Sequence, residues 1–225
     1  MSYFFTGVLW LISLMSQAQT MSIAGKVGGI YSSATHFKLY KYKTLFAKEL
    51  IKSIEPRDNQ FSFTMAATEY DLYMLQNSVD NRFIVFVWDG DIQIHVDSLE
   101  FDQSAIRDSP LTEQYDDFLQ RRNELFLAPL WRLDSLKQEW KVGARYSTAQ
   151  VDSLNYSYNQ LFETNKKEFK KYTQDYVAKN PGSPISLFIL TFTDDMATEE
   201  ENKRLFEGLS TDLKKHSRAR IYLEK

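Results

Sequence analysis

The pattern of apolar and polar residues changes near the middle of the chain. Before residue 109, apolar residues mostly recur at every second position, which is the period of a β-strand with one buried face. After it they recur at every third and fourth position, which is typical of amphipathic helices. At the change, Ser109 suits a helix N-cap and Pro110 suits the first helical position. The sequence therefore predicts an antiparallel β domain over residues 19–108 and a helical region over residues 109–225.

Short alternating runs in the first half predict several strands separated by turn residues. Residues 45–54 fit either a strand or a short helix. No helical run in this half is long enough to link parallel strands, so we expect an antiparallel sandwich or an open barrel. The predicted strands are Ser22–Val27, His36–Tyr42, Phe61–Met65, Tyr70–Leu75, Phe83–Trp88 and Asp91–Val96.

The dipeptide Asp89-Gly90 is the strongest local turn signal in this half. Asp-Gly suits the positive φ angles of a tight type I′ turn, which predicts a β-hairpin between Phe83–Trp88 and Asp91–Val96. The first of these strands is apolar on both faces, which indicates a central strand. The second has one polar face, which we expect to contact water.

Two long amphipathic segments in the second half predict a helical hairpin. Pro129 should kink or split the first of them, because proline lacks a backbone donor. Ser147 and Gln150 form a candidate capping box for the second, which ends at Asn180-Pro181-Gly182. Two shorter segments follow: Ile185–Phe192, which is apolar nearly all round, and a helix that begins at the capping box Thr198–Glu201. Together the two halves predict an α+β fold.

The N-terminus has the pattern of a secretory signal peptide. Tyr3–Met15 is an uncharged apolar run that is short for a membrane span, and Ser16 and Ala18 are small residues at the positions that a signal peptidase reads. We expect cleavage after residue 18, with Gln19 first in the mature chain. No later run is long and apolar enough to cross a bilayer, so we expect a soluble periplasmic protein.

The composition excludes some classes of function. The net charge of −3 gives no basic surplus for a phosphate backbone, so nucleic acid is not an expected partner. The chain has no cysteine, which excludes disulfides, thiol redox catalysis and a lipid-modified cysteine. With 225 residues and 43% hydrophobic residues, the chain can bury a core without disulfide support.

No catalytic, cofactor or metal site is predicted. The histidines His36, His95 and His216 lie on different predicted elements and match no metal-binding spacing, so surface or turn positions explain them. Asp89, Asp91 and Asp97 crowd one predicted hairpin and could bind calcium. No EF-hand loop is present, however, and turn chemistry accounts for the first two.

Other charged and glycine-containing motifs also favour structural interpretations. The glycines of Gly25-x-x-Gly28-Gly29 are not followed by the Gly-Lys-Ser/Thr of a phosphate loop. With 30 acidic residues, the chain could still hold a glycosidase-like carboxylate pair, so a hydrolase or other enzyme remains the alternative hypothesis. A basic strip on the second long helix is interpreted as a solvated face, with acids nearby; it consists of Lys166, Lys167, Lys170 and Lys171.

The order of these segments resembles the N-terminal region of TlpA/ResA-like thiol:disulfide interchange proteins. In that family an uncharacterised β-rich domain and a helical region precede a thioredoxin domain. The resemblance covers nearly the whole mature chain and rests on the order of short motifs. The matching segments are Ile23–Gly28, Asp89–Val96, Ser109–Tyr115, Asn180–Pro184 and Leu205–Leu213.

The departure from the family changes what the resemblance implies. In the family, a stretch like Leu205–Ser210 leads into a thioredoxin domain with Cys-x-x-Cys, whereas this sequence has no cysteine. No redox residue can therefore be carried over. The leading hypothesis is a non-catalytic binding or scaffolding module of the cell envelope, which engages a protein partner or an extended ligand through a sheet edge or the groove between its halves. The partner implied by the resemblance is a thioredoxin-like protein.

Overall fold

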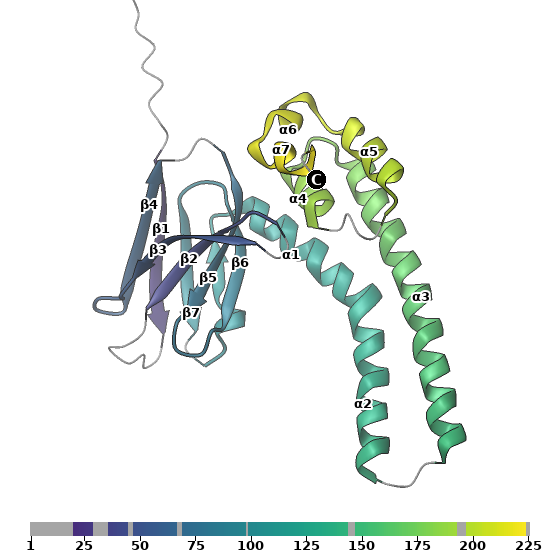
Figure 1. The fold of residues 1–225 in the computed structure, drawn as a ribbon. Helices are drawn as coiled ribbons and strands as arrows, with labels where there is room; N and C mark the ends of the chain where they lie inside the picture. The colour runs from purple at the N-terminus through teal and green to yellow at the C-terminus, as the bar shows by residue number, and fades with distance from the viewer. Residues whose placement is uncertain are drawn as a thin grey trace, which may run out of the picture.

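The computed structural model describes residues 20–28, 36–44, 47–66, 69–97, 99–143, 147–192 and 197–223. Its fold is α+β, with strands in two sheets followed by helices, as the sequence predicts (Figure 1). The predicted signal peptide, residues 1–18, lies outside the described residues. Within the described ranges, every helix is too short or too polar to cross a bilayer.

Eight strands in the described part of the chain form two four-stranded sheets that pack face to face. The pairs are antiparallel except that β1 and β7 run parallel, which the sequence prediction missed. A short 3₁₀ helix, η1 (Phe101–Gln103), follows β7. The first sheet has the order β4 (Gln60–Ala66), β1 (Thr20–Gly28), β7 (Ile92–Asp97) and β8 (Ala105–Arg107). The second has the order β3 (Lys48–Ile54), β2 (Phe37–Tyr42), β5 (Asp71–Asn77) and β6 (Phe83–Trp88).

Alternating side chains from both sheets fill the core of the sandwich. The inward residues of β1 and β4 meet aromatic residues of the second sheet, such as Phe37, whose ring centroid lies 4.9 Å from that of Phe61. The Phe61 ring also lies over Gly25, where an added Cβ would come within 2.0 Å of the ring. Gly25 is thus required for close packing of this ring.

The predicted hairpin between β6 and β7 is wrong, because the two strands belong to different sheets. The Asp89-Gly90 linker crosses between the sheets, and the φ angle of Gly90 lies outside the left-handed region. The Trp88 indole N–H donates to the Gly90 carbonyl at 2.9 Å, and the Asp89 carboxylate accepts the Leu111 N–H at 3.0 Å. These bonds hold the linker against the start of the helical region.

The tight turn of this half lies instead between β3 and β4. Asp58 and Asn59 have φ angles of 50° and 57°, which is the conformation of a type I′ turn. Arg57 and Gln60 flank them and exchange two backbone hydrogen bonds of 2.8 Å. Asparagine and aspartate tolerate this left-handed conformation better than most residues.

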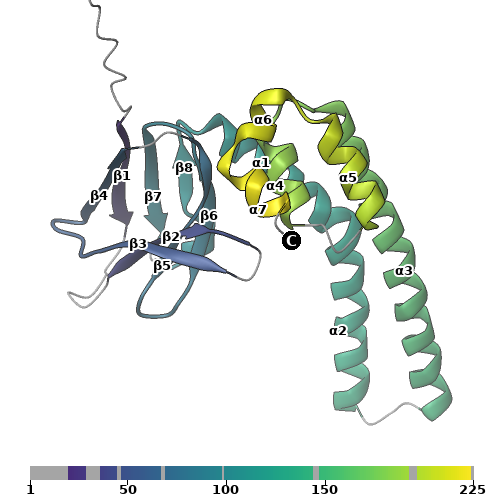
Figure 2. The same cartoon turned by 45° about the horizontal axis from the view of Figure 1, so that its top comes forward.

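The helical region forms the predicted hairpin, in which α2 and α3 lie side by side and extend away from the sheets (Figures 1 and 2). Its first segment is split by a π-helical turn, η2 (Asn123–Leu127), one turn before Pro129. The break is expected there because the proline cannot donate to the carbonyl of Leu125. The helices are α1 (Pro110–Arg122), α2 (Ala128–Gly143), α3 (Thr148–Lys179), α4 (Pro184–Phe192), α5 (Glu199–Gly208), α6 (Thr211–Lys215) and α7 (Ser217–Leu223).

The helices cover the outer face of the second sheet. Leu72 of β5 and Val87 of β6 point away from the sandwich and join a second core with α1, α3 and α4. β5 and β6 of the second sheet are therefore buried on both faces, which explains why β6 is apolar on both sides. At the start of α1, the Thr112 hydroxyl accepts the Val87 N–H at 3.0 Å and the Ser109 hydroxyl donates to the Val87 carbonyl at 2.9 Å.

Both predicted capping boxes are present, and one of them also ties two helices together. Glu201 accepts the backbone N–H of Thr198 at 2.7 Å, and the Thr198 hydroxyl accepts the N–H of Glu201 at 3.2 Å. Lys170 of α3 lies 2.7 Å from the same carboxylate. The Lys170 ammonium, followed by the Thr198 N–H, lowers the pKa of Glu201 from 4.5 to about 2.

This lowered pKa predicts a loss of stability in acid. The carboxylate stabilises the fold fully above pH 4.5, and that contribution is lost as the pH falls toward 2. Glu201→Gln keeps an oxygen that can accept the Thr198 N–H but lacks the charge, so the thermal midpoint of the wild type should exceed that of the variant above pH 4.5 and approach it in acid. Glu200→Gln, which removes an exposed charge one residue away, is the control. A difference between wild type and Glu201→Gln that does not change with pH would contradict this prediction.

Candidate functional site

A concave surface with a volume of about 920 Å³ lies on the sandwich and is here called the sandwich groove. Its floor comes from the first sheet, and its rim comes from the end of β3 and the turn before β4. Ten of the fifteen described lining residues are polar or charged, and the other five are apolar or glycine. They are Ala24, Gly25, Lys26, His36, Ser53, Ile54, Glu55, Arg57, Gln60, Phe61, Ser62, Gln93, Ile94, His95 and Arg107.

The strand register arranges the exposed floor residues in rows across the sheet. Their neighbours along each strand point into the core, so alternation directs these side chains to the outer face. Adjacent rows are separated by two residues along each strand and present amide, hydroxyl and cationic groups together. One row is Ser62, Ala24, Gln93 and Arg107, and the next is Gln60, Lys26 and His95.

The described lining of the sandwich groove has more cationic than anionic side chains although the whole chain is negative, and the Asp108 carboxylate accepts a hydrogen bond from Gln93 on the floor at 2.9 Å. Lys26, Arg57 and Arg107 line the groove, and none of the three forms an ion pair with any residue that the structure describes. Glu55 is the one carboxylate among the described lining residues, and it lies 3.5 Å from the His36 ring. Such a surface can donate hydrogen bonds and attract an anion.

The structure brings two of the three histidines to the sandwich groove. His36 lies on the rim and His95 on the floor, whereas His216 lies at the junction with the helices. Within the described ranges, no group of three histidine, aspartate or glutamate residues is placed to hold a metal ion.

The three aspartates that could have formed a calcium site each bind a different part of the chain. Asp91 accepts both the N–H and the hydroxyl of Ser22, at 2.8 and 2.7 Å. Asp97 accepts the N–H groups of Leu99 and Glu100, at 2.8 and 3.1 Å. Asp89, as described above, caps the start of α1. Each carboxylate therefore accepts hydrogen bonds from a different segment of the chain, and the three do not form a common site.

The lysines of α3 and the glycines of β1 lie on different elements, and Gly25 lines the sandwich groove. Lys170 pairs with Glu201, and Lys171 lies 2.6 Å from Asp175 one turn along the helix. The other two lysines of this strip, Lys166 and Lys167, are exposed. Gly25 and Gly28 lie within β1, and Gly29 is outside the described residues.

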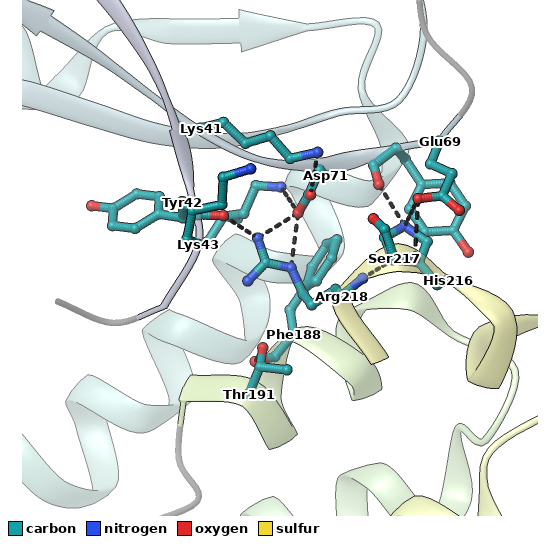
Figure 3. A network of polar contacts seen from close by, with 12 residues as sticks. Lys41, Tyr42, Lys43, Glu69, Asp71, Phe188, Thr191, His216, Ser217 and Arg218 are labelled. Carbon is teal, nitrogen blue, oxygen red and sulfur yellow. Dashed lines mark hydrogen bonds and ion pairs between the residues drawn. The ribbon is translucent and has the colours of Figure 1, made fainter. Parts of the chain in front are cut away.

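A buried charge cluster at the junction of the two halves was not predicted (Figure 3). Arg218 of α7 is fully buried and donates through Nε and Nη2 to one oxygen of Asp71, at 2.8 and 2.5 Å. Lys41 lies 2.8 Å from the other oxygen. Arg218 also donates to the Tyr42 carbonyl at 2.6 Å. We call these residues, with His216, the junction network.

His216 completes the junction network and fixes the start of α7. Its Nδ1 accepts the Arg218 backbone N–H at 3.1 Å, so Nε2 carries the hydrogen and donates to the Tyr70 carbonyl at 2.8 Å. Nearby, Glu69 accepts the Ser217 N–H at 3.2 Å. Apart from Arg218 Nη1, which is buried with no hydrogen-bond partner among the described residues, the polar groups of this network bind other parts of the chain and hold α7 on β5.

Comparison with known proteins adds no family assignment, because no family model and no curated protein matches this sequence. The resemblance to the N-terminal region of TlpA/ResA-like proteins stays a prediction. The sandwich groove is the feature that supports a functional proposal.

Proposed function

We propose that this protein is an exported, non-catalytic binding or scaffolding module of the cell envelope, and that it holds a protein partner or an extended ligand in the sandwich groove. The observation that carries the proposal is the set of exposed amide, hydroxyl and cationic side chains that the strand register places in rows on the first sheet. The apolar run Tyr3–Met15, followed by Ser16-Gln17-Ala18, supports export.

The chemistry of the sandwich groove favours binding over hydrolysis. A glycosidase needs two carboxyl groups that flank the scissile bond. The described lining supplies Glu55, whose carboxylate is beside His36. Because the chain has no cysteine, a role in a redox pathway would consist of holding a cysteine-bearing partner, such as a thioredoxin-like protein.

Site-directed cross-linking tests this proposal. A photoreactive residue at position 93, on the groove floor, should give discrete cross-linked products in cells that express the full chain. The same residue at position 156, where Tyr156 is exposed on α3, should not give these products. The expected difference follows from a ligand that occupies the sandwich groove.

A groove-filling variant provides the matched control. Ala24→Trp places a large side chain between Ser62 and Gln93 without changing the charge, and should abolish the cross-links from position 93. Cross-links that persist in this variant would show contact elsewhere. Release of soluble products from cell-envelope material, abolished by Glu55→Gln, would instead establish the hydrolase alternative.

A further inference from the structure

The outer edge of β4 has backbone groups that no described residue binds. The Val27 N–H donates to the Asn59 carbonyl at 2.9 Å, which fixes the hydrogen-bonded pairs of the β1–β4 ladder at every second residue from that point. Gly25 pairs with Phe61 in this way. Ser62 and Thr64 therefore direct their N–H and C=O groups away from β1, at the end of the first sheet.

The open edge borders the positive side of the sandwich groove. Ser62 belongs to the edge and also lines the groove. Arg57 lies in the turn that leads into β4, and Lys26 lies on β1 directly opposite Gln60. Arg107 lies on β8, at the other end of the same sheet, and adds to the positive potential.

We propose that the ligand is an acidic, extended peptide segment of a partner protein, which adds as a strand to the open edge of β4. This inference rests on the proposed function and names the class of its ligand. The peptide backbone pairs with Ser62 and Thr64, and its acidic side chains on the groove side face Lys26 and Arg57. Arg107 contributes long-range attraction.

The edge geometry favours a peptide over an acidic polysaccharide. Free N–H and C=O groups at the spacing of a β-ladder match a peptide backbone, which supplies both donors and acceptors at that spacing. Side chains of an added strand alternate between the two faces, so every second one points toward the groove. Lys26 is two strand spacings, about 10 Å, from an added strand, a distance that a lysine and a glutamate side chain span together.

The binding experiment uses fluorescence anisotropy with a short labelled peptide in which glutamate alternates with threonine. The full mature chain should bind this probe, less tightly as salt is added, and should not bind the same peptide with lysine in place of glutamate. Lys26→Gln combined with Arg57→Gln should weaken binding by roughly tenfold or more, because charge-assisted hydrogen bonds are lost. Lys203→Gln, which alters an exposed residue on α5, should leave the affinity unchanged.

Edge variants separate strand addition from simple charge attraction. Ser62→Pro removes an outward N–H that forms no ladder bond within the protein, and proline is tolerated at such edge positions. It should bind roughly tenfold more weakly than Ser62→Ala, which lacks the same hydroxyl but keeps the N–H. Thermal melts of each variant establish that it is folded. Full affinity in Ser62→Pro would overturn strand addition even if the charge effect holds.

The outcomes distinguish failure of this inference from failure of the proposed function. Binding of polygalacturonate with none of the acidic peptide would overturn the peptide inference and keep a binding role for the sandwich groove. The same holds if neither probe binds but position 93 still gives cross-links that Ala24→Trp abolishes. Absence of both probe binding and cross-links would overturn both proposals.

Discussion

Replacement of Asp71 by asparagine is expected to lower the free energy of unfolding by about 3–5 kcal/mol. Asp71 is 2% exposed and Arg218 is fully buried, so the substitution leaves a buried guanidinium without its counter-charge. Chemical denaturation at neutral pH measures the loss. An unchanged slope of the unfolding free energy against denaturant concentration would show that the variant unfolds from the same compact state.

A double-mutant cycle separates the interaction energy between Asp71 and Arg218 from the effect of each single substitution. Arg218→Met removes the buried cation and keeps an apolar side chain of similar length, so Asp71→Asn should cost less in that background than in the wild type. Lys41→Met should cost less than Asp71→Asn, because the Lys41 side chain is 24% exposed and water screens its charge. A loss below roughly 1 kcal/mol for Asp71→Asn would show that the junction network does not hold the two halves together.

The sequence indicates one member of the buried Asp71–Arg218 pair but not the other. Asp71 stands in an apolar run that was predicted to be a strand, and a carboxylate buried in a sheet requires a cationic partner. Its partner Arg218 lies 147 residues away along the chain. No local pattern selects it among the 27 lysines and arginines, because the pairing depends on how α7 packs on β5.

Local signals also explain which parts of the fold were predicted and which were not. Alternation located six of the eight described strands, but it left β3 ambiguous between strand and helix and did not indicate the three-residue β8. The capping boxes at Ser147 and Thr198 located two helix starts, because they depend on residues close in sequence. The prediction of a hairpin at Asp89-Gly90 was wrong although these residues favour a tight turn, because β6 and β7 belong to different sheets. β6 is buried on both faces and β7 on one, a difference that arises because only the second sheet is covered by helices.

The sandwich groove could be predicted only in part for the same reason. Alternation places Gln93 and His95 on a wet face, and that much follows from the sequence. That they share a surface with Lys26 depends on the parallel pairing of β1 with β7, between strands about 70 residues apart. Arg57 was not singled out at all, because a lone arginine beside a turn carries no signal.

Truncation of Phe118 to alanine should destabilise the whole protein, including the sandwich, because Phe118 shares a core with Leu72 of β5 and Val87 of β6. Phe118 is 3% exposed and connects α1 to α3 through rings of Phe169, Tyr172 and Tyr176 at 5.4–6.2 Å. Loss of a buried phenylalanine side chain costs about 3–5 kcal/mol. Tyr156→Ala, at a site on α3 that is 67% exposed, should change the free energy of unfolding little.

Both halves should respond to Phe118→Ala because they share the second sheet, whose inner face belongs to one core and whose outer face belongs to the other. In a background with Trp10, Trp131 and Trp140 replaced by phenylalanine, the buried Trp88 reports on the sandwich alone, while circular dichroism at 222 nm follows the helices. The two signals should give one common unfolding midpoint, and the variant should lower it for both. If the helical signal moved while the Trp88 signal kept its midpoint, the β half and the helical half would be independent folding units.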